Sequence, residues 1–207
     1  TSGYEEAAAQ GLVAGINAAR AIRREPPFTL GRDEAYIGIL VDDLITRGCL
    51  EPYRMFTSRA EHRLLLRIDN ADLRLTPAGR RLGLVDEERW ARFEARRARH
   101  ERNIAALRQT PVRADSGERI NAAALLRRPD VRLEALLASG NAALDLAETT
   151  RELDVASIEN EIKYAGYLKQ EAARADRMRR QERRRIPDDF SFARVPGLSR
   201  EVVLRLS

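Results

Sequence analysis

The chain has 207 residues, of which 37 are basic and 32 acidic, for a net charge of +5. No apolar run approaches the roughly eighteen residues that a membrane span requires, and a single cysteine, Cys49, excludes an internal disulfide. His62 and His100 have no acidic or cysteine companions at ligand spacing, so the sequence predicts no metal site. We therefore expect a cytoplasmic protein without membrane contact.

The positive charge is carried almost entirely by arginine, because Lys163 and Lys169 are the only lysines. The excess of basic side chains lies in the middle of the chain and in a late segment, with a more acidic stretch between them. Two separate positive regions favour a polyanion that contacts two surfaces over a single small ligand. Nucleic acid is the first candidate partner.

The first predicted helix covers residues 1–24, with Thr1 or Ser2 as its cap and with Glu5 and Glu6 in its first turn. A helix that begins a chain in this way is expected to be the last helix of a larger domain. One of its faces consists of small residues, and tight packing is a better explanation of that face than a ligand. These residues are Ala7, Gly11, Ala14 and Gly15.

The next predicted helix covers residues 33–47 and ends at Gly48. Its apolar stripe is expected to consist of Ile37, Leu40, Val41 and Leu44. Asp42 and Asp43 are adjacent in this helix, and neighbours on a helix point about 100° apart. A solvated or arginine-paired face therefore explains them better than acid–base catalysis.

A stretch of like charges dominates residues 51–76. Ser58 is expected to cap a helix, and Glu61, three residues later, completes a capping box. Three arginines would then share one face of that helix, where they form either a solvated, salt-bridged face or a surface that binds phosphate. These are Arg59, Arg63 and Arg67.

The middle of the chain is predicted to continue with helices. A turn at 69–72 precedes a short helix that has Pro77 at its first position and ends at Gly83. A long charged helix follows at residues 86–109, and residues 111–155 are expected to hold several short helices between glycine and proline breakers.

A second long helix is predicted from Ser157 to about Arg184, and a last helix begins near Ser199. Both ends of the sequence resemble cuts within a longer protein. From spacing and charge alone, the chain is predicted to be a helical segment that binds anions.

Four segments resemble the carboxy-terminal part of the bacterial tRNA uridine 5-carboxymethylaminomethyl modification enzymes, the MnmG or GidA family. They are TSGYEEAAAQGLVAGINAAR, EPYRMFTSRAEHRLLLRIDNADLRLT, RRLGLVDEERWARF and EIKYAGYLKQ. The resemblance covers most of the chain except roughly residues 111–155. The resemblance implies a mainly α fold, namely a helical carboxy-terminal domain preceded by the last helix of a truncated FAD-binding domain. The implied parts are residues 1–24 (that last helix), 25–155 (a helical, tRNA-facing subdomain) and 156–207 (the truncated start of a carboxy-terminal helical subdomain).

The resemblance also implies an activity for the full-length parent. Such enzymes use FAD, with NADH as reductant, and act with an MnmE-type GTPase to add an aminomethyl or carboxymethylaminomethyl group to carbon 5 of the wobble uridine in tRNA. The parent is expected to be a homodimer. The family's glycine-rich fingerprint and catalytic cysteines belong to its amino-terminal region, and Cys49 does not replace them. We therefore expect no catalytic residue in this segment, no activity from it alone and an incomplete region for docking the GTPase.

The matching positions imply two sets of binding residues. The cofactor set is Gln10, which corresponds to the FAD-contacting glutamine of the family, followed by Gly3, Tyr4 and Glu5. The tRNA set is Arg67, then Arg63, Arg59 and Arg74. His62 stands where the family pattern has a tyrosine, which weakens any base-stacking role at that position.

A second interpretation remains open beside the resemblance. A non-enzymatic helical scaffold could dock a protein partner and use its arginines in ion pairs. RNA affinity discriminates between the two interpretations, because only the tRNA-facing segment requires it.

Overall fold

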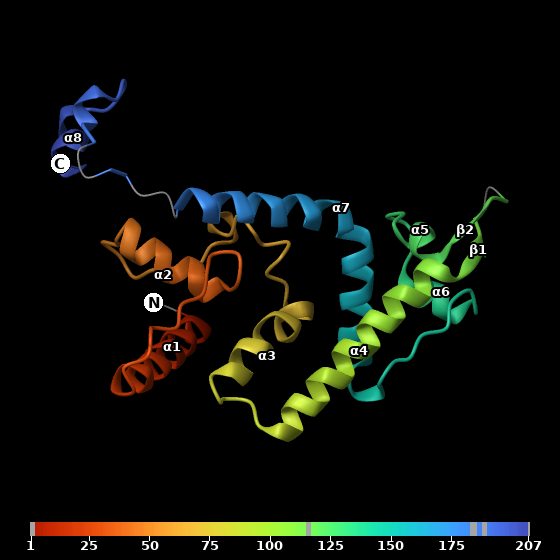
Figure 1. Ribbon diagram of the computed structural model, residues 1–207. Coiled ribbons are helices and arrows are strands. Elements are labelled where there is room, and N and C mark those ends of the chain that lie inside the picture. The colour runs from red at the N-terminus through yellow and green to blue at the C-terminus, as the bar shows by residue number, and fades with distance from the viewer. Residues whose placement is uncertain (1–2, 115–116, 183–185, 188–189, 207) are drawn as a thin grey trace. The chain divides into compact units, whose positions relative to one another are not determined.

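A computed structural model of the chain describes residues 3–114, 117–182, 186–187 and 190–206. The fold is mainly α, as predicted, and Figure 1 traces its elements in chain order. The helices are α1 (Tyr4–Ile22), α2 (Tyr36–Thr46), α3 (Ala71–Arg81), α4 (Glu87–Gln109), α5 (Ala122–Leu126), α6 (Leu133–Ala138), α7 (Arg151–Glu182) and α8 (Arg200–Leu206). Single turns of 3-10 helix occur at η1 (Thr57–Arg59), η2 (Ile68–Asn70), η3 (Glu148–Thr150) and η4 (Phe192–Arg194).

The chain divides into two compact units, Thr1–Ala172 and Ala173–Ser207. The division falls within α7, whereas both predicted domain boundaries, at 24/25 and 155/156, lie inside the first unit and stay predictions. The second unit contains η4 and α8, and the rings of Phe190 and Phe192 meet edge to face at 5.1 Å beside η4. The two predicted caps of the first helix, Thr1 and Ser2, lie outside the described residues.

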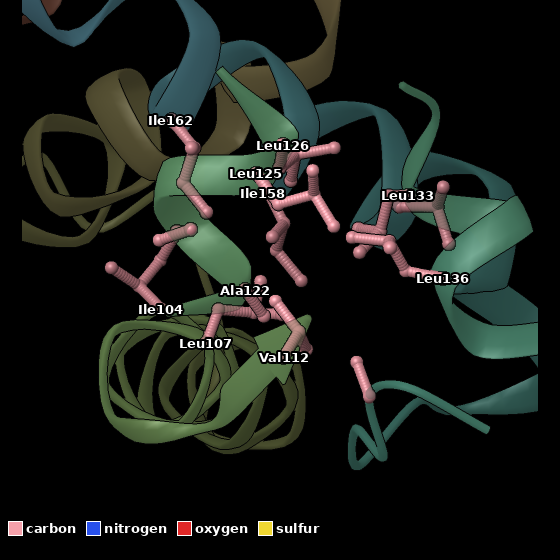
Figure 2. Close-up of a cluster of buried hydrophobic side chains, with 13 residues drawn as sticks. Ile104, Leu107, Val112, Ala122, Leu125, Leu126, Leu133, Leu136, Ile158 and Ile162 are labelled. Atoms are coloured by element: carbon pink, nitrogen blue, oxygen red, sulfur yellow. The ribbon is translucent and has the colours of Figure 1, made fainter. Parts of the chain in front are cut away.

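The main hydrophobic core of the first unit lies where α4, α5, α6 and α7 meet. Figure 2 shows its labelled side chains pointing toward one another from these helices and, in the case of Val112, from the short strand that follows α4. Its buried members are Ile104, Leu107, Val112, Ala122, Ala123, Leu125, Leu126, Leu133, Leu136, Ala142, Val155, Ile158 and Ile162. Residues 111–155, the segment without a family resemblance, therefore supply nine of the thirteen buried members of this core.

A short β-hairpin in this region corrects the expectation of helices alone. Strands β1 (Pro111–Arg113) and β2 (Arg119–Asn121) pair antiparallel, with Val112 opposite Ile120. Each strand has only three residues, which is too short for an alternating pattern to stand out in the sequence. Asn121 then caps α5 by accepting a hydrogen bond from the amide of Ala124.

Two helices begin earlier than predicted because tertiary contacts hold their first turns. Helix α3 starts at Ala71 and contains Pro77, which the sequence places at its first position. The buried guanidinium of Arg96 in α4 donates to the carboxylate of Asp72 and to the carboxylate of Asp154. These ion pairs fix the starts of α3 and α7, and α7 therefore begins six residues before the predicted Ser157.

Helix α2 forms where predicted, but a different stripe of it is buried. Its buried residues are Gly38, Ile39, Leu40 and Asp43. Val41, which belongs to the predicted stripe, is 39% exposed. The shift follows from the linker before α2, because a Cβ atom built on Gly38 would lie only 2.2 Å from the carbonyl oxygen of Gly31. The backbone of the linker thus packs directly onto α2 at a position that admits no side chain.

Gly38→Ala is expected to lower the free energy of unfolding by about 1–3 kcal/mol, since the linker must move away from α2 to admit the methyl group. Urea unfolding followed by circular dichroism measures the change. Gly166→Ala in α7 is the matched control, because its added Cβ meets nothing within 4 Å. The control is expected to stabilise the protein by up to about 1 kcal/mol through helix propensity. Equal effects of the two substitutions would contradict the close contact.

Candidate functional site

The predicted arginine helix does not form. Residues Thr57–Arg59 make one 3-10 turn, residues 61–65 form turns, and the chain reaches a second 3-10 turn only at Ile68. Ala60 interrupts the helix with φ −97° and ψ 84°. The three arginines therefore do not share a helical face, which corrects the expectation from their four-residue spacing.

Arg32, in the linker before α2, binds the carboxylate of Glu61, the residue that was expected to complete the capping box. Its Nε donates to Glu61 Oε1 at 2.6 Å, and its Nη1 donates to both Asp42 and Asp43 at 2.8 Å. Its Nη2 also donates to the backbone oxygen of Arg59 at 3.2 Å. Donation from Arg32 lowers the pKa of Glu61, although partial burial opposes the shift. One guanidinium thus joins the linker, α2 and the turn at residues 59–61.

Asp43 is the buried acceptor of this network, with 1% of its side chain exposed. Burial opposes ionisation, but donation from Arg32, Tyr53 and Arg59 outweighs it and lowers the pKa of Asp43. The Tyr53 hydroxyl donates to Asp43 Oδ2 at 2.8 Å, and burial together with this carboxylate raises the pKa of Tyr53 to about 12. Asp42 and Asp43 therefore form an arginine-paired face, the interpretation that the sequence favoured over acid–base chemistry.

Two predicted tRNA residues lie beside this network in different environments. Arg59 places its Nη1 3.3 Å from Asp43 Oδ2 and its guanidinium 5.1 Å from the centre of the Tyr53 ring. Arg63 is exposed, and no ion pair joins it to another residue in the described ranges. Arg59 therefore contributes to the fold, whereas the charge of Arg63 remains directed to solvent.

The other two predicted tRNA residues, Arg67 and Arg74, lie together. Arg67 pairs with Asp69, with Nε 3.1 Å from Oδ1, and donates to the backbone oxygen of Leu64. Arg74 donates to Asn70 Oδ1 at 3.0 Å and to the backbone oxygens of Glu34 and Arg67. Burial, reinforced by the nearby charge of Arg67, lowers the pKa of Arg74.

His62 is almost fully buried, with 2% of its side chain exposed, and its Nδ1 lies 3.2 Å from Glu171 Oε2 in α7. A ring in this position is not available to stack on a nucleotide base. This placement is consistent with the weakened stacking role expected where histidine replaces the tyrosine of the family pattern.

The four predicted cofactor residues lie in the first two turns of α1 and at its start. Gly3 is the N-cap and makes no side-chain capping bond, so the first amides of the helix have no side-chain acceptor there. Tyr4 is 94% exposed, and α1 has no buried residue. Gly3, Tyr4, Glu5 and Gln10 thus lie at the amino-terminal end of α1, a helix that is partly covered by α2.

Within residues 3–114, 117–182, 186–187 and 190–206, no three histidine, cysteine, aspartate or glutamate side chains gather closely enough to hold a metal ion. Across those same ranges, no helix combines the length and the apolar character that crossing a bilayer demands. Cys49 is an exposed free thiol.

Comparison with known proteins first defines the class of domain. Residues 87–172 match the tRNA modifying enzyme MnmG/GidA C-terminal helical domain, which agrees with the arrangement of α4 to α7. Residues 1–26, which include α1, match the family described as glucose inhibited division protein A.

Whole-chain relatives then give the family. The chain is 52% identical, over 97% of its length, to the tRNA uridine 5-carboxymethylaminomethyl modification enzyme MnmG of Roseiflexus sp. (strain RS-1), and 47% identical over 98% to that of Syntrophotalea carbinolica. The structure of Aquifex aeolicus GidA in its form II crystal covers the whole chain with a TM-score of 0.80 at 35% identity.

The chain belongs to the MnmG/GidA family, which confirms the resemblance seen in the four sequence segments. It spans about a third of the length of these relatives: 31% of the Roseiflexus protein, 34% of the Syntrophotalea protein and 34% of the Aquifex chain.

Sequence reasoning missed the residues that position the arginines. Arg32 lies between the predicted helices at residues 1–24 and 33–47, and 29 positions separate it from its partner Glu61. No local pattern connects residues so far apart. The adjacent acids Asp42 and Asp43 were the one available signal, because buried carboxylates require cationic partners.

Asp43→Asn is expected to destabilise the chain by about 3 kcal/mol, because it leaves the buried guanidinium of Arg32 without its most buried counter-charge. Denaturant unfolding gives the free energy. Asp42→Asn is the matched neighbour, with 40% of its side chain exposed and one ion pair to the same arginine. Its loss is expected to cost about 0.5 kcal/mol. A cost at Asp42 as large as that at Asp43 would refute the assignment of the network to buried charge.

Proposed function

We propose that this chain is the tRNA-facing helical part of an FAD-dependent enzyme that modifies carbon 5 of the wobble uridine. The group added would be aminomethyl or carboxymethylaminomethyl, with NADH as the reductant. The observation that carries the proposal is 52% identity over 97% of the chain to a tRNA uridine 5-carboxymethylaminomethyl modification enzyme. The segment would contribute tRNA binding and one edge of the FAD site, and it would not be active alone.

The tRNA-binding role is supported by how the exposed arginine is presented. Arg32 and Asp43 hold the turn at residues 59–61 against α2, and Arg63 follows this turn with its side chain in solvent. A guanidinium without an internal carboxylate partner keeps its charge available for a phosphate oxygen. We assign the first contact with the tRNA backbone to Arg63, and we assign to Arg59 and Arg67 the additional role of fixing the turns around it.

The cofactor role is supported by the start of α1. Its uncapped amides and the positive end of the helix dipole suit an electron-rich group of the cofactor. Glu5 and Glu6 follow at once and carry negative charge, so the environment fits the polar edge of a flavin or ribose hydroxyls better than a pyrophosphate. Gly3, Tyr4, Glu5 and Gln10 would line this edge, and FAD, when bound, would supply the redox chemistry.

The remaining partners follow from the family and belong to the same proposal. An MnmE-type GTPase would act with the whole enzyme, the parent would be a homodimer, and the reaction would take place in the cytoplasm. The alternative function is a scaffold that docks a protein and uses its arginines in ion pairs. The pairs of Arg59 with Asp43 and of Arg67 with Asp69 favour that alternative for those two residues.

Arg63→Gln is expected to weaken tRNA binding and to reduce the slope of log affinity against log salt by about 1, because one phosphate contact is lost. Filter binding of tRNA at several salt concentrations measures both quantities. Arg63 is preferable to Arg67 for this test, because its side chain makes no internal ion pair in the described ranges and its replacement is expected to leave the fold intact.

Arg205→Gln in α8 is the control, since Arg205 is also exposed but pairs with Glu201 at 2.7 Å. The control is expected to retain the wild-type salt slope. Identical binding by both variants would remove Arg63 from the interface. Capture of a GTPase by a chain with no measurable RNA affinity would replace the proposal with the scaffold.

A further inference from the structure

A pocket of about 460 Å³ lies in the first unit between the turns that follow His62, α3, α4 and α7. Its polar lining consists of three guanidiniums, two carboxylates, one amide and one hydroxyl. The charged residues give an excess of one positive charge, and Leu65, Ala165 and Leu168 form the apolar part of the wall. The polar lining residues are Asp33, Arg67, Asn70, Arg74, Arg108, Ser157 and Glu161.

The three guanidiniums come from three different elements and differ in how they are paired. Arg67 is the one with a carboxylate partner, Asp69. The hydrogen bonds of Arg74 go to an amide oxygen and two backbone oxygens, none of which carries a charge. Arg108, near the end of α4, is exposed and has no ion pair among the residues that the structure describes. Two positive charges therefore face this pocket without a carboxylate of their own.

Glu161 supplies the nearest counter-charge in the pocket. Its Oε2 lies 2.7 Å from His100 Nε2, and 43% of its side chain is exposed. The bond to His100 lowers the pKa of Glu161 against the effect of burial, and the charges of Arg108 and Arg67 lower it further. Arg67, Arg108 and His100 therefore create a positive electrostatic potential at the Glu161 carboxylate. A positive potential at this place favours a negatively charged group.

We propose that this pocket binds a phosphate group, with Arg74 and Arg108 as its principal donors and Glu161 as an internal counter-ion that moderates its affinity. A guanidinium presents paired donors that match the oxygens of phosphate, and three such groups on separate elements can surround one. The proposal rests on the proposed function in one respect: the expected source of the phosphate is the backbone of the bound RNA. A free phosphate compound shares the same chemistry.

The Ser157 hydroxyl adds a neutral donor at the wall formed by α7. Asp33, in the linker before α2, adds a second carboxylate to the lining. This carboxylate limits the net positive charge of the pocket and disfavours binding of a second anion. The pocket thus combines charged and neutral donors around a space of about 460 Å³, which is large enough for one phosphodiester.

Binding of inorganic phosphate to the whole chain, measured by isothermal titration calorimetry, tests the pocket directly. Arg108→Gln is expected to weaken phosphate binding about tenfold, because an exposed donor at the rim is lost without disturbing the core. Glu161→Gln is expected to strengthen it several-fold by removing the internal counter-ion. Arg92→Gln is the control on the same helix, since its exposed guanidinium pairs with Glu88 and lies outside the pocket.

The source of the phosphate is decided by tRNA binding in the same variants. If RNA supplies it, Arg108→Gln lowers the salt slope by about 1 while Arg92→Gln does not. A loss of phosphate affinity with an unchanged tRNA slope supports the pocket but overturns the RNA source. Equal phosphate affinity in Arg108→Gln, Arg92→Gln and wild type overturns the pocket itself. Absence of tRNA binding by the wild-type chain contradicts the proposed function, and the calorimetry still decides the pocket.

Discussion

The ion pair between Arg32 and Asp43 is the contact on which the arrangement of the arginine-rich stretch depends. It joins a linker without regular structure to the buried face of α2, and the same guanidinium binds Glu61 and the backbone of Arg59. The hydrophobic cluster of this region is smaller than the main core, since its buried members are Ile39, Ala60 and Leu66. Ion pairs therefore hold the arginine-rich stretch in place, whereas apolar packing holds α4 to α7 together.

The arginines of this region therefore fall into two groups, those that bond within the chain and those that face solvent. Arg59 and Arg67 form ion pairs within the chain. Arg63 and Arg108 are exposed, so their guanidiniums can donate to solvent or to a ligand. Arg74 lies between these cases, because it is partly buried but bonded only to neutral oxygens. A basic segment can therefore contribute to nucleic-acid binding although some of its arginines never touch the ligand, since their internal bonds position the others.

The sequence predicted the helices whose causes are local and missed the features whose causes are distant. Helix α4 forms over almost all of the predicted residues 86–109, with Asp86 as its N-cap, because its charge pattern and capping bond lie within one segment. The start of α3 and the buried stripe of α2 depend on Arg96 and on the linker backbone, and no periodicity in the sequence could reveal either contact.

The family and the mainly α class were predicted correctly from long strings of residues. The pocket joins residues from Asp33 to Leu168, so only the fold could assemble it.

Helix α1 has no buried residue, and this has a consequence for the order in which parts of the chain open. The amide of Asn17 donates to the backbone oxygen of Phe28 at 2.9 Å, and Arg20 donates to that of Pro26 at 2.6 Å. These polar bonds and the partly buried side chains that face α2 hold the helix, so its local stability is expected to be lower than that of the main core. We therefore expect the backbone amides of α1 to exchange with solvent through a local opening, while the Arg32 contacts stay closed.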